Sequence, residues 1–510
     1  MVTTSAPIAA FRFDNSFARE LQGFYVSRQP AFARAPRLLF LNDSLVEELG
    51  LDLTSLDSAA RTAIFAGNTL PDGAEPLAQA YAGHQFGGFS PQLGDGRALL
   101  LGEVIDRQGR RRDIAFKGSG RTPFARGGDG KAAVGPMLRE VLVSEGMNAL
   151  GIPTTRALAA VATGEEVYRE RVLPGAVLTR VAASHIRVGT FEFYAARGEM
   201  ERLRKLAEYT IARHDPACAT TPQPVLGLLR NVAARQAALI AQWMNVGFIH
   251  GVMNTDNMTI SGEIIDYGPC AFIEAYDPAA VFSSIDLHGR YAFGNQPNIA
   301  GWNLARLAEA LLPLLSDDHD EAMAMATEVI VAFPAQYREQ LLRGQRRKLG
   351  LRREEPGDDS TDTALAEDWL ALLHAHQVDF TLGWRRLADV AAGDEAPLRA
   401  LFADDASAPD AWLARWRARC ASESLSAPHD AELAGSERAK EMRSVNPIII
   451  PRNHRVEEAL AAASDQNDLA PFQRLLDAIR RPYDDSDALA PYAEPAPVAV
   501  TASYRTFCGT

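Results

Sequence analysis

One stretch near the middle of the chain concentrates side chains that can hold a metal ion or move a proton: residues 250–266, with the sequence HGVMNTDNMTISGEIID. Within it, the β-prone runs MTI and EII are separated by two residues, Ser261 and Gly262. Two such runs joined by a two-residue link are typical of a tight β-hairpin. We therefore expect a short hairpin with polar residues at its open end.

The expected pairing of this hairpin places an amide opposite a carboxylate. In a two-residue hairpin Met258 pairs with Ile265, so the next pair outward is Asn257 with Asp266. Directly opposed residues lie roughly 5 Å apart at Cβ, close enough for both side chains to bind one hard cation. The pattern predicts a Mg²⁺ or Mn²⁺ site, with Asp256 as a candidate base beside it. The alternative is an ordinary surface hairpin with polar ends.

This pattern resembles the catalytic loop of protein kinases and aminoglycoside kinases, in which an Asn and a later Asp hold the metal. Those kinases place the catalytic Asp two residues after a His. Here His250 and Gly251 are followed by Val252, so the expected base is missing. The nearest replacement is Asp256.

A lysine and a glutamate in the N-terminal half are expected to form an ion pair. The run DIAFK ends at Lys117 and reads as a strand in which Ile114 and Phe116 share one face. Residues 136–150 read as a helix, with Pro136 at its start and Gly151 just beyond its end. Glu140 on this helix can reach Lys117, as the helix-C glutamate of kinases does. Glu145 is a rival partner, and Glu140 as a plain surface residue is the alternative.

Glycines and arginines near this lysine suggest a phosphate site. Backbone amides in the turn Gly94-Asp-Gly96-Arg97 can approach a phosphate closely. The segment GSGRTPFARGGDGK follows Lys117, and LTRVAASHIRVGTFE carries Arg180 and Arg187. Arginine suits bidentate phosphate contacts. Any one of these residues alone is more often a surface residue, but together they bracket the lysine and the glycine turn.

Composition excludes several classes of protein. The chain has 510 residues, of which 47% are hydrophobic and 23% charged, as in ordinary globular enzymes. A net charge of −13 argues against nucleic-acid and membrane-surface binding, because both require a basic face. We see no spanning segment and no secretory signal. The four cysteines are scattered without zinc-site spacing, which favours a reducing cytoplasm. The sequence gives no sign of an oligomer, so a monomer is expected.

The order of elements predicts an α+β protein with a protein-kinase-like two-lobe fold. Residues 1–198 are expected to form an N-terminal extension and a strand-rich N-lobe; residues 199–510 are expected to form a helical C-lobe with the metal-binding hairpin and a tail. Three-to-four-residue apolar spacing predicts helices at 201–213, 225–244, 302–315, 322–343, 363–376 and 411–420. Pro-, Asp- and Ala-rich stretches near 353–364, 424–436 and 481–500 are expected to be linkers or tail.

With these residues in view, the chain resembles the selenoprotein O family, as a cysteine-containing bacterial-type member. The landmarks, spread over nearly all of the chain, are YAGHQFGGFSPQLGDGRA, IAFKGSGRTPFARGGDGK, SHIRVGTFEF, HGVMNTDNMTISGEIIDYGPCAF and the C-terminal TFCGT. The resemblance implies a kinase-like fold that binds ATP in a flipped orientation. It also implies transfer of AMP to Ser, Thr or Tyr hydroxyls of proteins, with release of pyrophosphate and with UTP as an open alternative donor.

Carried over residue by residue, the resemblance assigns a role to each candidate. Asp256 is the proton acceptor, Asn257 and Asp266 hold Mg²⁺ or Mn²⁺, and Glu140 positions Lys117. The nucleotide site is lined by Gly94, Gly96, Arg97, Lys117, Asp129, Gly130, Arg180, Arg187 and Asp266. AMP transfer also explains the extra arginines, because attack on the α-phosphorus puts charge on the departing pyrophosphate.

Two cysteines are candidates for redox control. Cys270 lies four residues after Asp266, and Cys508 stands in the TFCGT ending, near the C-terminus, where the resemblance implies selenocysteine in the family's eukaryotic members. A Cys270–Cys508 disulfide would restrain the loop beside the metal site; two unrelated thiols are the alternative. For the whole protein, an atypical kinase that transfers the γ-phosphate and a catalytically silent pseudokinase scaffold remain the alternatives to a protein adenylyltransferase.

Overall fold

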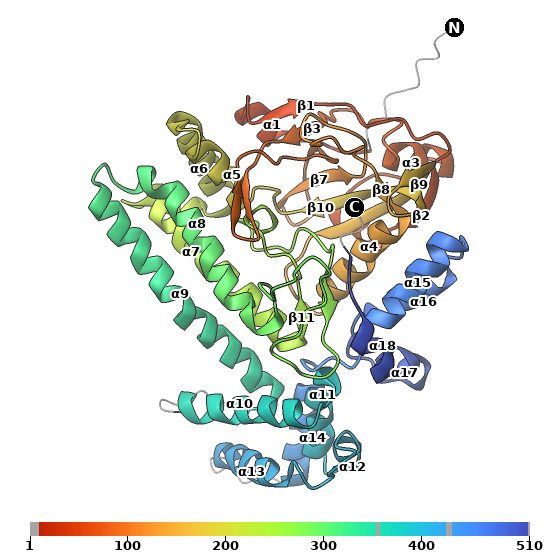
Figure 1. The fold of residues 1–510 in the computed structure, drawn as a ribbon, viewed down its shortest axis with the longest axis vertical. Helices are drawn as coiled ribbons and strands as arrows, with labels where there is room; N and C mark the ends of the chain where they lie inside the picture. The colour runs from red at the N-terminus through yellow and green to blue at the C-terminus, as the bar shows by residue number, and fades with distance from the viewer. Residues whose placement is uncertain (1–9, 353–357, 425–430, 508–510) are drawn as a thin grey trace.

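An antiparallel β-sheet occupies the N-terminal part of the computed structural model, which describes residues 10–352, 358–424 and 431–507 (Figure 1). Its strands follow the order β1-β3-β6-β7-β10-β9-β2, and the short β8 pairs with β10. In chain order they are β1 (Tyr25–Ser27), β2 (Arg37–Leu41), β3 (Leu77–Gln79), β6 (Ala98–Ile105), β7 (Arg111–Lys117), β8 (Ala132–Ala133), β9 (Arg156–Tyr168) and β10 (Val172–Ala182). Two small sheets pair β4 (Gly83–Gln85) with β5 (Gly88–Ser90), and β11 (Phe248–Ile249) with β12 (Ala271–Phe272).

Strand β7 lies in the middle of the large sheet, between β6 and β10. Lys117, its last residue, is paired with Ala98 of β6 and Leu178 of β10. Ile114 and Phe116 enter one hydrophobic cluster and Ala115 enters another, because successive side chains of a strand point to opposite faces. The backbone of Lys117 is thus fixed by neighbouring strands on both sides.

Helices dominate the chain after residue 188, and Figure 1 shows them grouped below and beside the sheet. The α-helices are α1 (Ser16–Glu20), α2 (Asp43–Leu49), α3 (Ser58–Phe65), α4 (Val134–Ala149), α5 (Val188–Ala195), α6 (Met200–His214), α7 (Pro224–Val246), α8 (Gln296–Leu315), α9 (His319–Lys348), α10 (Asp359–Ala375), α11 (Phe380–Ala391), α12 (Ala396–Arg399), α13 (Asp410–Ser424), α14 (Ala431–Arg443), α15 (Asn453–Asp465), α16 (Ala470–Ile479), α17 (Ala490–Ala493) and α18 (Val498–Ser503). Short 3₁₀ turns are η1 (Pro216–Thr220), η2 (Thr255–Asn257), η3 (Phe293–Asn295) and η4 (Asp487–Leu489).

Every helix predicted from apolar spacing is present, within a few residues at most ends. Helix α8 begins six residues before its prediction because Pro297, in its first turn, suits a helix start. All three stretches expected to be linkers or tail contain helix: residues 359–364 belong to α10, residues 431–436 to α14, and residues 490–493 and 498–500 to α17 and α18. Composition misled there, because Pro and Asp also suit the first turn of a helix and Ala has the highest helix propensity.

Helix α4 packs against the C-terminal part of the chain. Leu138, Val141 and Leu142 of α4 share a buried cluster with Leu475 and Ile479 of α16. Helices α15 and α16 both contact α4, and Figure 1 shows them beside it. The C-terminal region therefore fixes a helix that belongs, by sequence, to the sheet region.

The predicted hairpin at residues 258–265 is present only as a single bridge, and its register is wrong by one residue. Met258 pairs with Ile264, not with Ile265. The Thr259 hydroxyl donates to the Glu263 carbonyl at 2.7 Å and accepts from its N–H at 3.1 Å, which lengthens the turn. Asn257 belongs to the turn η2 and does not stand directly opposite Asp266.

No helix among the described residues combines the length and the apolar character needed to cross a membrane.

Candidate active site

A cavity of about 500 Å³ gathers almost all of the predicted site residues. It is lined by the end of β7, the glycine turn before β6, the loop after β7, the end of β10 and residues 250–269. Among the predicted residues, the lining includes Gly94, Gly96, Arg97, Lys117, Asp129, Gly130, Arg180, Arg187, Asp256, Asn257 and Asp266. Glu140 lies behind this lining, in contact with Lys117.

Lys117 is buried between two carboxylates. Its ammonium group donates to Glu140 Oε1 of α4 and lies 3.2 Å from Asp266 Oδ1. Glu145, the rival partner, instead pairs with Arg156 at 2.7 Å and with Arg480 at 3.0 Å. The structure thus contains the strand-to-helix ion pair expected from the sequence, and it adds the metal-site carboxylate to it.

Asp266 is held as an anion. Burial alone would raise its pKa, but Lys117, Arg97 and Arg180 hold that pKa well below its ordinary value of 3.8. A carboxylate that stays ionised in a cationic cavity suits a hard divalent cation.

Two side chains of the cavity could hold a divalent cation. Asn257 Nδ2 donates to the Val252 carbonyl at 3.0 Å, which leaves the amide oxygen of Asn257 without a hydrogen bond to the described chain. Together with Asp266, that oxygen provides two hard ligands in one cavity. No cluster of three or more His, Cys, Asp or Glu residues suited to a metal is found in the described part of the chain. Mg²⁺ is commonly held by one or two side chains plus phosphate oxygens, so two ligands suffice.

At Asp256, in contrast to Asp266, the effect of burial on the pKa outweighs that of the nearby cations. Its Oδ1 atom is buried without a hydrogen-bond partner, although part of the side chain faces the cavity. An ideal Cβ on Gly83 would come within 2.9 Å of that oxygen, so only glycine leaves room for it there. Burial raises the pKa of Asp256 to about 6, against the opposing effect of Arg187. Such a carboxylate is ionised at neutral pH and is still ready to accept a proton.

The glycine turn is shaped by packing against the loop that follows β7. Gly94 has a φ of +78°, and a Cβ there would overlap the ring of Phe124. Asp95 turns inward: its Oδ2 accepts from the Gln79 N–H at 3.0 Å, and its carbonyl accepts from the Thr122 hydroxyl at 2.6 Å. These contacts hold the turn and the loop together at one side of the cavity.

Several cationic groups of the cavity lack an anionic partner. Arg97, Arg126 and Arg180 line it, and among the described residues none of the three forms an ion pair with a carboxylate. Arg180 Nη1 donates instead to the Ile265 carbonyl. The exposed Asp129 is engaged by Arg169 at 2.9 Å, so its carboxylate is not free to bind a metal. The cavity therefore offers an excess of guanidinium groups to an anionic ligand.

Arg187 lies near Asp256 and opposes the rise of its pKa. Its guanidinium stacks over the Tyr81 ring at 4.2 Å from the centroid and lies 3.5 Å from Asp95 Oδ1. It also donates to the His185 carbonyl at 3.1 Å. The orientation of Arg187 thus depends on where the backbone of His185 is held.

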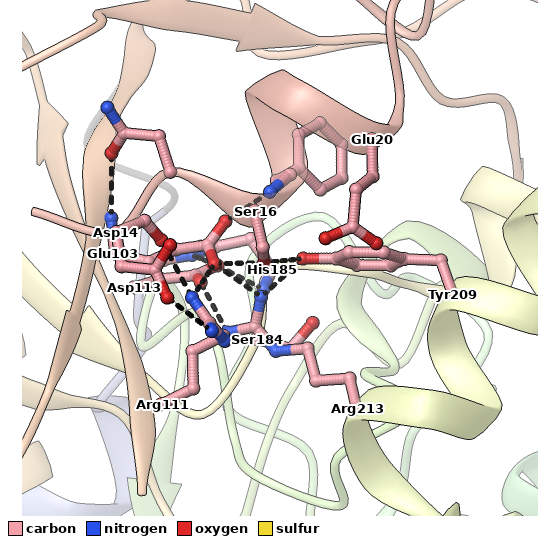
Figure 2. Close-up of polar contacts among 12 residues, drawn as sticks. Asp14, Ser16, Glu20, Glu103, Arg111, Asp113, Ser184, His185, Tyr209 and Arg213 are labelled. Carbon is pink, nitrogen blue, oxygen red and sulfur yellow. Dashed lines mark hydrogen bonds and ion pairs between the residues drawn. The ribbon is translucent and has the colours of Figure 1, made fainter.

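Figure 2 shows the buried polar network that holds His185. Asp113 Oδ2 accepts from the His185 N–H at 2.9 Å and lies 2.8 Å from its Nδ1, while Arg213 bonds Asp113 Oδ1. Burial lowers the pKa of His185, so the ring is neutral at pH 7. Glu103 and Tyr209 extend the network toward the N-terminal helix α1. Four separate segments of the chain thereby support the loop that carries Arg187.

Sequence reasoning missed a group of uncharged residues in the cavity. Gln85 lies close enough to Asp256 to lower the pKa of its carboxyl, and Asn254 Oδ1 accepts from the Phe86 N–H at 3.1 Å and from the Tyr291 hydroxyl at 2.6 Å. Gln85 and Phe86 belong to the motif YAGHQFGGFS, whose glycine density was the available signal. Nothing in the sequence indicated that this motif would fold back onto Asp256.

Cys270 is buried beside the cavity, and burial raises the pKa of its thiol to about 12. The C-terminal segment lies next to it, since the Thr506 hydroxyl donates to the Pro269 carbonyl at 2.8 Å. Cys218 and Cys270 are free thiols. Cys508, the predicted partner of Cys270, lies outside the described residues.

Comparisons with known proteins point to one family over nearly the whole chain. The family model described as "Protein adenylyltransferase SelO" matches residues 7–480. A protein named "Protein nucleotidyltransferase YdiU" from Cereibacter sphaeroides is 60% identical over 501 residues, covering 98% of this chain and 100% of the relative. Proteins of the same name from Rhizobium etli (57% identical; 99% of this chain, 98% of the relative) and Chromobacterium violaceum (58%; 94% and 98%) are similar to it as well.

The raised pKa of Asp256 predicts that this residue costs stability. An acid whose pKa is raised on folding, here from 3.8 to about 6, destabilises the fold increasingly as pH rises through that interval and fully above it. Asp256→Asn should therefore stabilise the ligand-free protein at pH 8, by at most roughly 3 kcal/mol. The gain in melting temperature should shrink as pH is lowered toward 4.

The control for this measurement is Asp368→Asn, which removes a surface carboxylate paired with Arg415 at 2.6 Å. That variant should be neutral or slightly less stable, because exposed ion pairs contribute little. A melting temperature for Asp256→Asn at or below that of the wild type at pH 8 would contradict the assigned environment of Asp256.

Proposed function

The chain belongs to the SelO family of protein adenylyltransferases, and we propose that it transfers AMP from ATP to Ser, Thr or Tyr hydroxyls of proteins and releases pyrophosphate. The observation that carries this proposal is that one cavity contains both a buried carboxylate that can take up a proton, Asp256, and an excess of guanidinium groups. Each half of that arrangement serves one half of the reaction.

Asp256 is the proposed general base. The acceptor hydroxyl attacks the α-phosphorus, its proton passes to the Asp256 carboxylate, and the bond between the α-phosphorus and the bridging oxygen breaks. A pKa of about 6 keeps the carboxylate ionised at neutral pH while leaving it basic enough to take the proton. Arg187, placed by the His185 network, limits how far burial raises that pKa.

The unpaired guanidinium groups are proposed to stabilise the departing pyrophosphate. When the α-phosphorus is attacked, negative charge develops on the β- and γ-phosphates, and pre-positioned cations near them lower the barrier. Arg97, Arg126 and Arg180 line the cavity and form no ion pair with a carboxylate among the described residues. Phosphate groups can therefore bind these arginines without breaking an ion pair. Lys117 adds a fourth cation, held in place by Glu140.

Asn257 and Asp266 are the proposed ligands of Mg²⁺ or Mn²⁺. A divalent cation, when bound, neutralises phosphate charge and helps to orient the polyphosphate. The residues themselves are arranged for this: the Val252 carbonyl turns the Asn257 amide, and the surrounding cations keep Asp266 ionised. We also propose a protein-kinase-like arrangement, with residues 1–198 as an N-terminal extension and N-lobe and residues 199–510 as C-lobe. The large sheet in the first part and the many helices in the second support this division.

Labelled nucleotide separates this proposal from a kinase and from a scaffold. With Mg²⁺ or Mn²⁺, the purified protein should transfer label to itself or to added protein from α-labelled ATP and not from γ-labelled ATP, because only the adenylyl group is retained. A parallel reaction with α-labelled UTP measures the choice of nucleotide. Transfer from the γ position alone would establish a kinase, and nucleotide binding without any transfer would establish a scaffold.

Two alanine variants should separate base from metal ligand. Asp256→Ala should lower kcat by roughly 10²–10⁴-fold with ATP affinity nearly unchanged, because the base acts on the incoming hydroxyl. Asp266→Ala should weaken metal-dependent ATP binding by about tenfold or more, because it removes the charged ligand. Calorimetric titration and α-label transfer report the two effects, with Asp368→Ala as the surface control. Equal losses of metal-dependent binding in both variants would disprove this division of roles.

A redox link between Cys270 and Cys508 is also proposed. Thr506 lies against Pro269, so the chain end starts beside Cys270. Because the pKa of the Cys270 thiol is about 12, we expect a thiol-specific oxidant such as diamide to form the disulfide slowly at pH 7 and faster at higher pH. Activity should change on oxidation and recover with dithiothreitol.

Peptide mass spectrometry without reductant should find the linked pair. Cys508→Ala should make activity insensitive to diamide, whereas the control Cys218→Ala should keep the response. Two free thiols after oxidation, or an unchanged response in Cys508→Ala, would refute the link.

A further inference from the structure

The part of the cavity beside Asp256 differs in chemistry from the part that carries the cations. The glycine turn, the end of β7, the loop after it and the end of β10 supply Arg97, Lys117, Arg126 and Arg180. Beside Asp256, the lining includes the uncharged residues Gln85, Phe86 and Asn254, and Arg187 is its cationic neighbour. If phosphate groups occupy the cationic part, an incoming hydroxyl has to reach Asp256 along the side lined by Gln85, Phe86 and Asn254.

Phe86 adopts a conformation that proteins rarely keep without a reason. Its φ is +52°, in the left-handed region that a bulky side chain adopts only at a cost in free energy. Two contacts hold it there: its N–H donates to Asn254, and its ring packs edge-on against Tyr291 with centroids 5.2 Å apart. Despite these contacts its side chain is 40% exposed. Strain of this kind is concentrated at binding and catalytic sites.

An apolar rim continues outward from Phe86. We define it as Phe86, Phe89, Ile285 and Leu287, whose exposed fractions are 40%, 42%, 46% and 85%. Phe86 and Phe89 flank Gly87 and Gly88 at the tip of the β4–β5 hairpin. Arg290 and Tyr291, which follow Ile285 and Leu287 in the chain, contact that tip: a Cβ on Gly87 would meet the Arg290 guanidinium at 3.6 Å, and the Tyr291 ring packs on Phe86. Both segments reach the cavity, through Phe86 and Ile285.

We propose that this apolar rim docks the acceptor protein, and that it selects a segment with a large apolar side chain near the modified hydroxyl. The inference rests on the proposed adenylyl transfer and adds its acceptor specificity. The rim is continuous with the part of the cavity that holds the base, so a segment delivering a hydroxyl to Asp256 lies across it. Burial of exposed Phe, Ile and Leu side chains against an apolar partner is favourable. Burying a charged residue against these apolar side chains would cost free energy, and we expect that cost to outweigh the attraction of Arg290 for an acidic flank.

Defined peptides test this specificity in the full-length enzyme. Each peptide carries one Ser, Thr or Tyr, with Phe, Leu, Gly, Asp or Lys at the flanking positions, and label is supplied as α-labelled ATP with Mg²⁺. Peptides with Phe or Leu next to the hydroxyl should be labelled about tenfold more efficiently than those with Gly, Asp or Lys, the factor expected from burying one apolar side chain.

Two rim variants locate the preference. Phe89→Ser and Leu287→Ser alter side chains that do not line the cavity, so ATP affinity measured by calorimetry should stay at the wild-type value. The KM for the preferred peptides should rise about tenfold, and the preference for apolar flanks should fall. The matched control is Val331→Ser on α9, a side chain that is 71% exposed and far from the rim in sequence; it should keep the wild-type KM. Unchanged melting temperatures verify that all three variants are folded.

The outcomes separate this inference from the function on which it rests. Self-labelling from α-labelled ATP, together with equal use of all peptides or wild-type KM values in both rim variants, would overturn the docking surface and leave adenylyl transfer intact. A preference for Asp- or Lys-flanked peptides would overturn it too. A dimer of the wild-type protein that Leu287→Ser dissociates in sedimentation would assign the rim to a second copy of the chain. Absence of α-label from every acceptor would remove the proposed function and this inference together.

Discussion

The buried ammonium group of Lys117 is the interaction on which the rest of the site depends. A buried cation is tolerated only when anions compensate it, and here Glu140 and Asp266 do so from segments 23 and 149 residues further along the chain. The strand that carries Lys117 is paired on both sides, and the helix that carries Glu140 is held by α15 and α16. The two ion pairs of Lys117 therefore connect the sheet with α4, on which the C-terminal helices pack, and with the segment that carries Asp266.

The two aspartates of the cavity show how neighbours, and not residue type, decide chemistry. Asp266 faces Lys117, Arg97 and Arg180, which hold its pKa below the ordinary value. Asp256 has one buried oxygen without a partner, and burial outweighs Arg187, so its pKa rises to about 6. A carboxylate that stays ionised and one that can be protonated near neutral pH thus arise from the same type of side chain within one cavity, a separation typical of enzymes that need both.

Local features of the chain were predictable from its sequence, and long-range ones were only partly so. The strand of Lys117, the helix of Glu140 and most other helices followed from local patterns, whereas the resemblance to kinases favoured Glu140 over Glu145 as the partner of Lys117. The register at residues 258–265 did not, because the Thr259 hydroxyl bonds the Glu263 backbone and changes the length of the turn. The approach of Gln85 and Phe86 to residues 254–256 depends on tertiary packing through Tyr291 and Gly83, which no local pattern encodes.

The electrostatics of the cavity oppose those of the whole protein. The chain carries a net charge of −13, yet Arg97, Arg126 and Arg180 line the cavity, and none of them forms an ion pair with a carboxylate of the described residues. Asp266 is the anion that lies near two of them. A polyphosphate bound in the cavity would add negative charge beside all three. Transfer of the α-phosphoryl group keeps that charge beside the arginines through the reaction, because the β- and γ-phosphates leave as one pyrophosphate. Transfer of the terminal phosphoryl group would carry part of it away, so the arrangement favours adenylyl transfer on physical grounds alone.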